Sequence, residues 1–140
     1  MTSTDWAETL ARHLLEEPLP RRWAHTTGVG ATARTLAGLL GDQADLLTAA
    51  AWLHDIGYSP ALAVTGFHPL DGARYLRDTG QAEPVVCSLI AHHTCAINEA
   101  DERGLAGETP RNSCNLLHAD GRHDHPVSAQ RLTQRLGKRF

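Results

Sequence analysis

The segment LLTAAAWLHD, residues 46–55, carries apolar side chains on nearly every face of a helix and then ends in a histidine and an aspartate. A helix that is apolar all round belongs in the middle of a domain. If its polar end is buried with it, the imidazole and the carboxylate need hydrogen bonds or a metal ion to offset their lost hydration. An isolated His-Asp pair is most often a solvent-facing helix end, so the rest of the chain decides between the two interpretations.

The remaining sequence also has the pattern of helices separated by short breaks, and no convincing pair of strands is evident. Prolines and glycines, which start or stop helices, bound most of these segments. The helices that we predict cover residues 5–16, 21–40, 43–55, 68–79, 84–103, 112–120 and 126–136. The expected fold class is therefore all-α, with a single domain over residues 1–140 built as a bundle of about six or seven helices.

Three glycines mark special positions in these helices. Gly57 follows the buried helix and is expected to stop it, as glycine commonly does. Gly28 and Gly30 lie inside the helix over residues 21–40, where each costs roughly 1 kcal/mol of helix propensity. They either allow another segment to pack closely against this helix or allow the helix to fray.

The overall composition excludes several classes of protein. The 140 residues are enough to bury one core, and the net charge of −3 provides no basic field, so we expect no nucleic-acid polymer as a partner. The three cysteines lack a C-x-x-C spacing, which argues against disulfides and thiolate zinc sites. The N-terminus has no signal-peptide pattern, and no run approaches the roughly 18 apolar residues of a membrane span. We therefore expect a cytoplasmic protein without membrane contact, whose oligomeric state stays open.

Histidine is over-represented, with nine copies against five tryptophans and tyrosines together. Histidine is the commonest metal ligand in proteins. The potential ligands fall on five of the predicted helices, mostly at helix ends: His25, His54 with Asp55, His68, His92 with His93, and Asp120. In a helical bundle, inward side chains of this kind can surround one or two metal ions. Neighbouring helical residues point about 100° apart, so His54 and Asp55 can share an ion only at a helix end, unless Asp55 bridges two ions.

The order H…HD…H…H…D over consecutive helices resembles the HD-domain superfamily of metal-dependent phosphohydrolases, from His25 to Asp120. The minimal signature of that superfamily would be His25, His54-Asp55 and Asp120, which bind one divalent ion. The stretches FHPLDGARYL and IAHHT resemble the dinuclear branch, which includes bacterial diadenosine tetraphosphate hydrolases and mixed-valent di-iron oxygenases.

This resemblance implies a division of the ligands between two ions. The first ion would be held by His25, His54, Asp55 and Asp120, and Asp55 would bridge to a second ion held by His68 and His93. Either His92 or His93 ligates, because their side chains differ by about 100° around a helix. Asp124 is the alternative to Asp120 as the last ligand. The remaining histidines near Asp120 are expected to be surface groups, with a third ion in the loop over residues 121–126 as the alternative: His118, His123 and His125.

Such a site suits Fe, Mn, Ni or Co, and Mg is possible. Two bridged ions about 3.5–4 Å apart share a water that loses its proton near neutral pH and becomes a nucleophilic hydroxide. We therefore predict an enzyme, a phosphohydrolase acting on a small phosphorylated metabolite or nucleotide. Asp55 and His92 are the candidate catalytic residues, with His92 donating a hydrogen bond to a phosphate oxygen or leaving group. The candidate substrate-binding residues, which are solvated cations in the alternative interpretation, are Arg21, Arg22 and Arg74.

Two alternatives remain. The same ligands around mixed-valent iron would support an oxygenase that cleaves a C–C or C–P bond. A catalytically inactive HD domain would serve as a sensor or binding module, although the intact ligands argue against this. Tyr58 stands where a second-messenger branch of the superfamily has lysine, and no GYP segment follows, so hydrolysis of cyclic dinucleotides is not expected.

Overall fold

The computed structural model describes residues 4–93, which are helical and contain no strand. Five α-helices occur in this range: α1 (Asp5–Leu15), α2 (Pro20–Leu40), α3 (Ala44–Leu53), α4 (His68–Thr79) and α5 (Pro84–Ala91). Single 3-10 turns precede and follow α3: η1 (Gly41–Gln43) and η2 (Ile56–Tyr58). The all-α prediction is confirmed. The helices predicted over residues 112–120 and 126–136 lie outside the described residues, so their existence stays a prediction.

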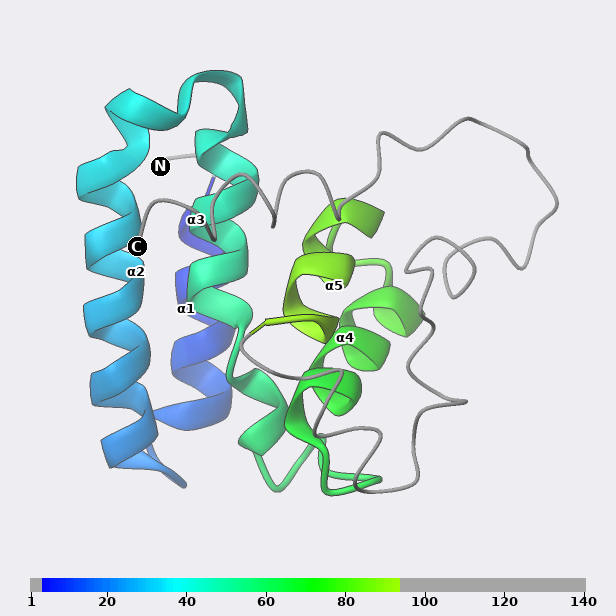
Figure 1. The fold of residues 1–140 in the computed structure, drawn as a ribbon. Helices are drawn as coiled ribbons and strands as arrows, with labels where there is room; N and C mark the ends of the chain where they lie inside the picture. The colour runs from blue at the N-terminus through cyan, green and yellow to red at the C-terminus, as the bar shows by residue number, and fades with distance from the viewer. Residues whose placement is uncertain (1–3, 94–140) are drawn as a thin grey trace, which may run out of the picture.

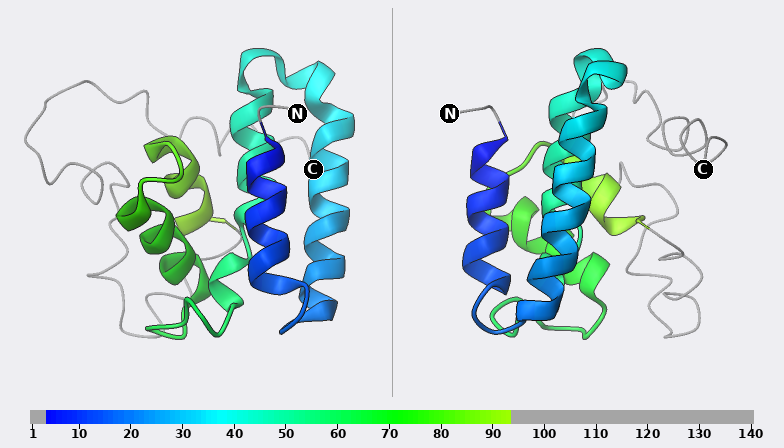
Figure 2. Two further views of the ribbon diagram at one scale, coloured as in Figure 1. Left: turned by 180° about the vertical axis from the view of Figure 1, so that it is seen from behind. Right: turned by 90° about the vertical axis from the view of Figure 1, so that its left-hand side faces the viewer.

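The helices form two groups that meet at α3 (Figure 1). In the first group α1, α2 and α3 lie side by side with their axes roughly aligned, and they contact one another. In the second group α4 packs on α5, and α5 in turn contacts α3 (Figure 2). Because α3 contacts α1, α2 and α5, this short helix joins the two groups.

The central position of α3 confirms the interpretation of its apolar sequence. Trp52 and Leu53 are buried completely or nearly so, and they belong to one apolar cluster with Leu15 of α1 and Ile90 of α5. Burial of a large apolar side chain contributes about 1.5–3 kcal/mol relative to leaving it exposed. The last turn of α3 is thus held firmly, and the residues that follow it leave the helix from a fixed point.

Two helix ends differ from the prediction. Helix α5 ends at Ala91 rather than near residue 103, so His92 and His93 follow the helix instead of lying inside it. Helix α3 ends at Leu53, and Gly57 lies beyond it in η2 with a negative φ, so Gly57 does not stop the helix. A side chain at Gly57 would collide with the main-chain carbonyl of His68. Glycine is needed here for the close approach of two backbones, which sequence spacing does not show.

None of the helices within residues 4–93 is long and apolar enough to cross a lipid bilayer.

The two glycines of α2 have different surroundings. A Cβ atom on Gly30 would overlap the indole ring of Trp52, whereas a Cβ atom on Gly28 would meet nothing within 4 Å. Helix α2 continues unbroken from Pro20 to Leu40 through both positions. Of the two expectations, close packing is therefore confirmed at Gly30, and the helix does not fray at either glycine.

This difference gives a matched pair of substitutions. Gly30→Ala is expected to destabilise the fold by about 1–2 kcal/mol, because the extra methyl group overpacks the Trp52 ring. Gly28→Ala is expected to stabilise it by about 0.5–1 kcal/mol, because only the helix-propensity gain remains. Urea unfolding followed by circular dichroism measures both. Equal effects of the two substitutions would contradict the packing of α2 on Trp52.

Candidate metal site

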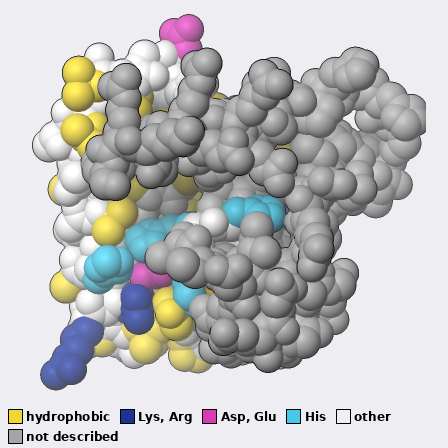
Figure 3. All heavy atoms as spheres, viewed as in Figure 1, with side chains coloured by type: hydrophobic (Ala, Val, Ile, Leu, Met, Phe, Trp, Pro, Cys, Tyr) yellow, Lys and Arg dark blue, Asp and Glu magenta, His cyan; other side chains and the backbone are white. Residues whose placement is uncertain are grey.

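The carboxylate of Asp55 lies at the centre of the site. Asp55 follows the last turn of α3 and is 3% exposed. Four imidazole rings reach it from three other parts of the fold and from its own neighbour: His25, His54, His68 and His93. On the face that Figure 3 shows, histidine side chains gather around an acidic one, with a Lys or Arg side chain beside them. The structure thus brings together all of the predicted ligands that lie within residues 4–93.

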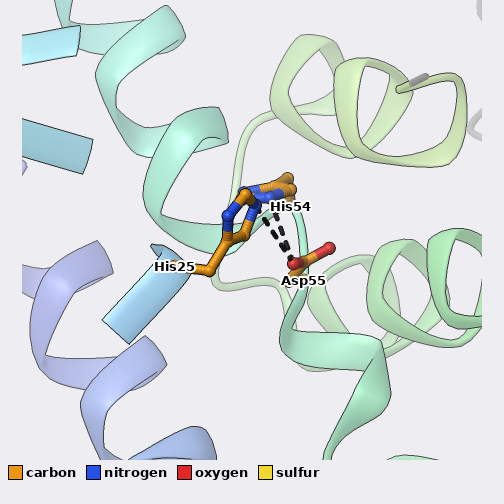
Figure 4. A group of neighbouring side chains, drawn as sticks. All are labelled: His25, His54 and Asp55. Carbon is orange, nitrogen blue, oxygen red and sulfur yellow. Dashed lines mark ion pairs between the residues drawn. The ribbon is translucent and has the colours of Figure 1, made fainter. Parts of the chain in front are cut away.

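One oxygen of the carboxylate faces the first pair of histidines. Asp55 Oδ2 lies 3.3 Å from His54 Nε2 and 3.8 Å from His25 Nε2. His25 projects from α2 and His54 from the end of α3, so two neighbouring helices supply this group (Figure 4). The three ligand atoms lie within 4.8 Å of one another, which is close enough for them to share a metal ion.

The other oxygen faces the second pair. Asp55 Oδ1 lies 3.4 Å from His68 Nε2 and 3.7 Å from His93 Nε2. The two imidazole nitrogens are 3.0 Å apart, and with the carboxylate oxygen they form a second group within 4.8 Å. His68 is the first residue of α4 and His93 comes just after α5. Since Asp55 offers a different oxygen to each group, its carboxylate has the arrangement of a bridge between two ions.

Main-chain contacts set the protonation of two rings. His54 Nδ1 lies 2.7 Å from the carbonyl oxygen of Ala51, and His93 Nδ1 lies 2.6 Å from that of Ile90. A carbonyl only accepts hydrogen bonds, so each Nδ1 carries the proton and donates. A neutral ring of this kind offers its Nε2 lone pair to a metal ion, and without an ion it can donate to Asp55 only when Nε2 is protonated as well. Metal-bound histidines usually have this same second contact, so the donor set fits a metal ion.

The electrostatics agree with a site built for cations. Burial alone raises the pKa of the Asp55 carboxyl, but hydrogen bonds from His54, His93 and Arg22 outweigh it and place this pKa well below its ordinary value. Burial lowers the pKa of His68 to about 4, and the neighbouring His93 contributes to this. Burial also opposes protonation of His54, yet its hydrogen bond to Asp55 and the charge of that residue raise the His54 pKa. At neutral pH the site therefore holds a buried negative charge and a neutral His68.

Arg22 reaches the same carboxylate. Its Nη1 donates to Asp55 Oδ2 over 3.0 Å, and its guanidinium carbon lies 4.0 Å from the centre of the Tyr58 ring. Arg21 is exposed and lines, with Arg22 and His25, a groove of about 590 Å³ beside the site. Arg74 is half-buried on α4. The structure thus places Arg22 in the site and Arg21 at its edge, and substrate binding by all three arginines stays a prediction.

The structure separates the two adjacent histidines that the sequence left open. His93, and not His92, is grouped with Asp55 and His68. His92 is half-buried at the end of α5, where its Nδ1 lies 2.8 Å from the carbonyl oxygen of Ser88. A catalytic role of His92 stays a prediction. The other ligand candidates lie outside the described residues: Asp120, its alternative Asp124, and His118, His123 and His125.

A buried carboxylate on α4 organises the approach to His68. Asp71 accepts hydrogen bonds of 3.1–3.2 Å from the main-chain N–H groups of Val64, Thr65 and Gly66, and one of 2.8 Å from the Thr65 hydroxyl. Its carboxylate thereby fixes the loop before α4, because loop amides that lack a helical partner need an acceptor. This contact positions His68 through the backbone.

This geometry agrees with the comparison of the sequence with known families. Residues 22–120 match the HD domain family, and this range contains every residue of the two groups around Asp55. The chain belongs to the HD-domain family. HD domains form a superfamily of metal-dependent phosphohydrolases. The match therefore agrees with the predicted family, with binding of divalent metal ions and with the general class of hydrolase.

The chain is also similar to HD-domain proteins named ribonuclease Y. That of Acidothermus cellulolyticus is 34% identical over 102 residues, which cover 73% of this chain and 18% of that protein. That of Frankia alni is 33% identical over 102 residues, which cover 73% of this chain and 12% of that protein. That of Streptococcus agalactiae is 36% identical over 69 residues, or 49% of this chain and 13% of that protein. The chain thus spans less than a fifth of the length of these relatives, and no solved structure matches it.

One prediction about partners is wrong. The net charge of −3 led us to expect no nucleic-acid polymer as a partner. The relatives named above are ribonucleases, which act on RNA. Net charge describes the field of the whole chain, whereas a metal centre attracts a phosphate locally, so the global charge was a poor guide for an HD domain.

Sequence reasoning missed two contributors to this HD site. The ring of Tyr58 stacks on the ring of His68, with 3.8 Å between centroids and 16° between planes. The sequence comparison noted only that Tyr58 replaces the lysine of another branch of the superfamily. Its spacing from His68 along the chain does not predict the stacking contact. Arg22 was expected to bind substrate, and its hydrogen bond to Asp55 was not predicted. The stacking contact depends on the turn η2, which carries Tyr58 past the end of α3.

The two groups around Asp55 predict the effect of removing single ligands. His68→Ala and His93→Ala should each lose one metal equivalent per chain and remain folded, because each removes a ligand from the second group only. Metal content is measured by elemental analysis of protein purified without oxygen or chelators, and folding by circular dichroism. His13→Ala, which changes an exposed histidine of α1, is the control and should leave the metal content unchanged. Unchanged metal content in both ligand variants would rule out the second ion.

Proposed function

We propose that this chain is a metal-dependent phosphohydrolase with a two-ion site, and that it cleaves a phosphoester, phosphodiester or phosphoanhydride bond. The observation that supports it is one buried carboxylate whose two oxygens each face a separate pair of imidazoles. Such an arrangement would suit a pair of divalent ions. The first ion would be held by His25, His54, Asp55 and Asp120, and the second by Asp55, His68 and His93.

The chain's own residues have separable tasks in this proposal. Bound divalent ions supply Lewis acidity and lower the pKa of a coordinated water. Asp55 holds the two halves of the site in register through its two oxygens. Arg22, and Arg21 at the edge of the groove, bind the non-reacting phosphate oxygens, because a guanidinium matches phosphate geometry with two parallel donors. His92 donates a hydrogen bond to a phosphate oxygen or to the leaving group.

Two substrate classes deserve testing. A ribonucleotide phosphodiester is favoured by the ribonuclease Y relatives. A small phosphorylated metabolite or nucleotide is the other class, since two arginines and His25 line a groove beside the site. The same kind of bond to phosphorus breaks in both substrate classes, so only a comparison of substrates in an activity assay decides between the two classes.

The oxygenase alternative shares this ligand set, and a bridged pair of iron ions would serve it. The ribonuclease relatives favour hydrolysis. Imidazole and carboxylate ligands suit iron, manganese, nickel or cobalt, and magnesium is possible. An inactive sensor module is disfavoured, because all of the predicted ligands within residues 4–93 lie together. We also propose that the protein is cytoplasmic and that a small phosphorylated molecule is one candidate substrate.

The test combines metal content with turnover. Protein prepared without oxygen or chelators should contain close to two metal equivalents. It should release phosphate or a nucleotide from at least one of three probes: a short oligoribonucleotide, a dinucleoside polyphosphate, and a mononucleotide. Asp55→Asn should lower the rate of hydrolysis at least ~100-fold, since it weakens the binding of both ions. Asp78→Asn, at an exposed aspartate of α4, is the control and should keep the wild-type rate.

The outcomes separate the candidates. Turnover of any probe that depends on Asp55 supports the hydrolase, and the probe identifies the substrate class. Oxygen consumption by an iron-loaded sample that hydrolyses none of the probes would replace the hydrolase with the oxygenase. Protein without metal and without turnover would favour the inactive module.

A further inference from the structure

The four histidines around Asp55 are not held in the same way. The rings of His54 and His93 are each fixed by a short hydrogen bond from Nδ1 to a carbonyl one turn back along the chain. Within residues 4–93, His68 Nδ1 has no such acceptor, and the hydrogen-bonding contact of its ring is made by Nε2. The His68 ring therefore lacks the restraint that holds His54 and His93. Another contact that orients it would reduce the entropy that the side chain loses when it binds a metal ion.

The Tyr58 ring provides that restraint. It lies face to face with the His68 imidazole at 3.8 Å and 16°, and its backbone N–H donates to the carbonyl of Asp55 over 3.1 Å. A stacked neighbour blocks rotation of an imidazole about its outer side-chain torsion, which otherwise has a broad range. Tyr58 therefore links the orientation of His68 to the residue that bridges the two groups.

Arg22 holds Tyr58 in turn. Its guanidinium lies over the Tyr58 ring at 4.0 Å while Nη1 donates to Asp55 Oδ2. The stacked imidazole covers one face of the phenol ring, so the guanidinium takes the other face. A cation over an aromatic ring is attracted by the ring's quadrupole. The ring of Tyr58 is thus held between Arg22 and His68, although 40% of the residue is exposed.

We propose that Tyr58 is a positioning residue whose aromatic ring fixes the His68 imidazole for the second metal ion. This inference rests on the two-ion site proposed above. The ring carries the effect and the hydroxyl does not, because the contacts with His68 and Arg22 are both made by the faces of the ring. Tyr58 needs no contact with the substrate for this task.

The test compares two substitutions at one position. Tyr58→Leu removes the stacking surface, and Tyr58→Phe keeps it while removing only the hydroxyl. The measurement is a calorimetric titration of metal-free protein with Mn²⁺ or Co²⁺, which separates two binding events if both sites exist. Tyr58→Leu is expected to weaken the second event ~10-fold or more, as loss of an orienting partner does, and to leave the first within about twofold. Tyr58→Phe should bind both ions as the wild type does.

Four results are informative. The expected pattern supports the proposal. Two binding events that are unchanged in Tyr58→Leu would overturn the role of Tyr58 and leave the two-ion phosphohydrolase intact. Equal loss in Tyr58→Phe and Tyr58→Leu would also overturn it, because the hydroxyl would then carry the effect. Fewer than two events in the wild type would overturn both the two-ion site and this inference.

Turnover is measured on the same samples but judged separately. Two ions that depend on the Tyr58 ring, without hydrolysis of any probe, would keep this inference and reject the phosphohydrolase. Circular dichroism confirms that each variant is folded. Should Tyr58→Leu fail to fold, Tyr58→Gln removes the aromatic ring with a side chain that suits this exposed position, and the same comparison with Tyr58→Phe applies.

Discussion

The carboxylate of Asp55 is the constraint on which the rest of this structure depends. A charge that is 97% shielded from solvent is costly unless several partners stabilise it, and here four imidazoles and one guanidinium surround it. Those partners come from α2, the end of α3, the start of α4 and the segment after α5. To satisfy one carboxylate, the fold has to bring two helix groups together, and that convergence also creates the two candidate ion positions.

The backbone around η2 shows how this convergence is achieved. Gly57 lies so close to the His68 carbonyl that no side chain fits between them, and Asp71 fixes the loop that leads to His68. Asp55 and His68 are thirteen positions apart in sequence, yet Gly57, two residues after Asp55, packs directly on the backbone of His68. The two ends of the metal site are therefore built on rigid elements, and ligands held in this way lose little entropy when an ion binds.

Only part of the site follows from residues 4–93. The first group offers His25, His54 and one oxygen of Asp55, and His25 remains largely exposed. The HD domain match continues to residue 120, so residues 94–120 fall within the matched range. The second group has its ligands in place without that segment. The dinuclear proposal therefore depends most strongly on His68 and His93, which the structure brings to within 3.0 Å of each other.

The sequence by itself determined the helical class, the burial of α3 and the set of metal-binding candidates, because these depend on local periodicity and on residue chemistry. The order of histidines and aspartates along the predicted helices, with the resemblance to HD domains, was enough to select His25, His54, Asp55, His68 and the His92–His93 pair. Only the tertiary structure decided that His93 faces Asp55, since this follows from where α5 ends. It also decided that Gly57 serves a backbone contact, that Arg22 bonds to Asp55 and that Tyr58 stacks on His68. Those contacts join residues through space, and no spacing along the chain encodes them.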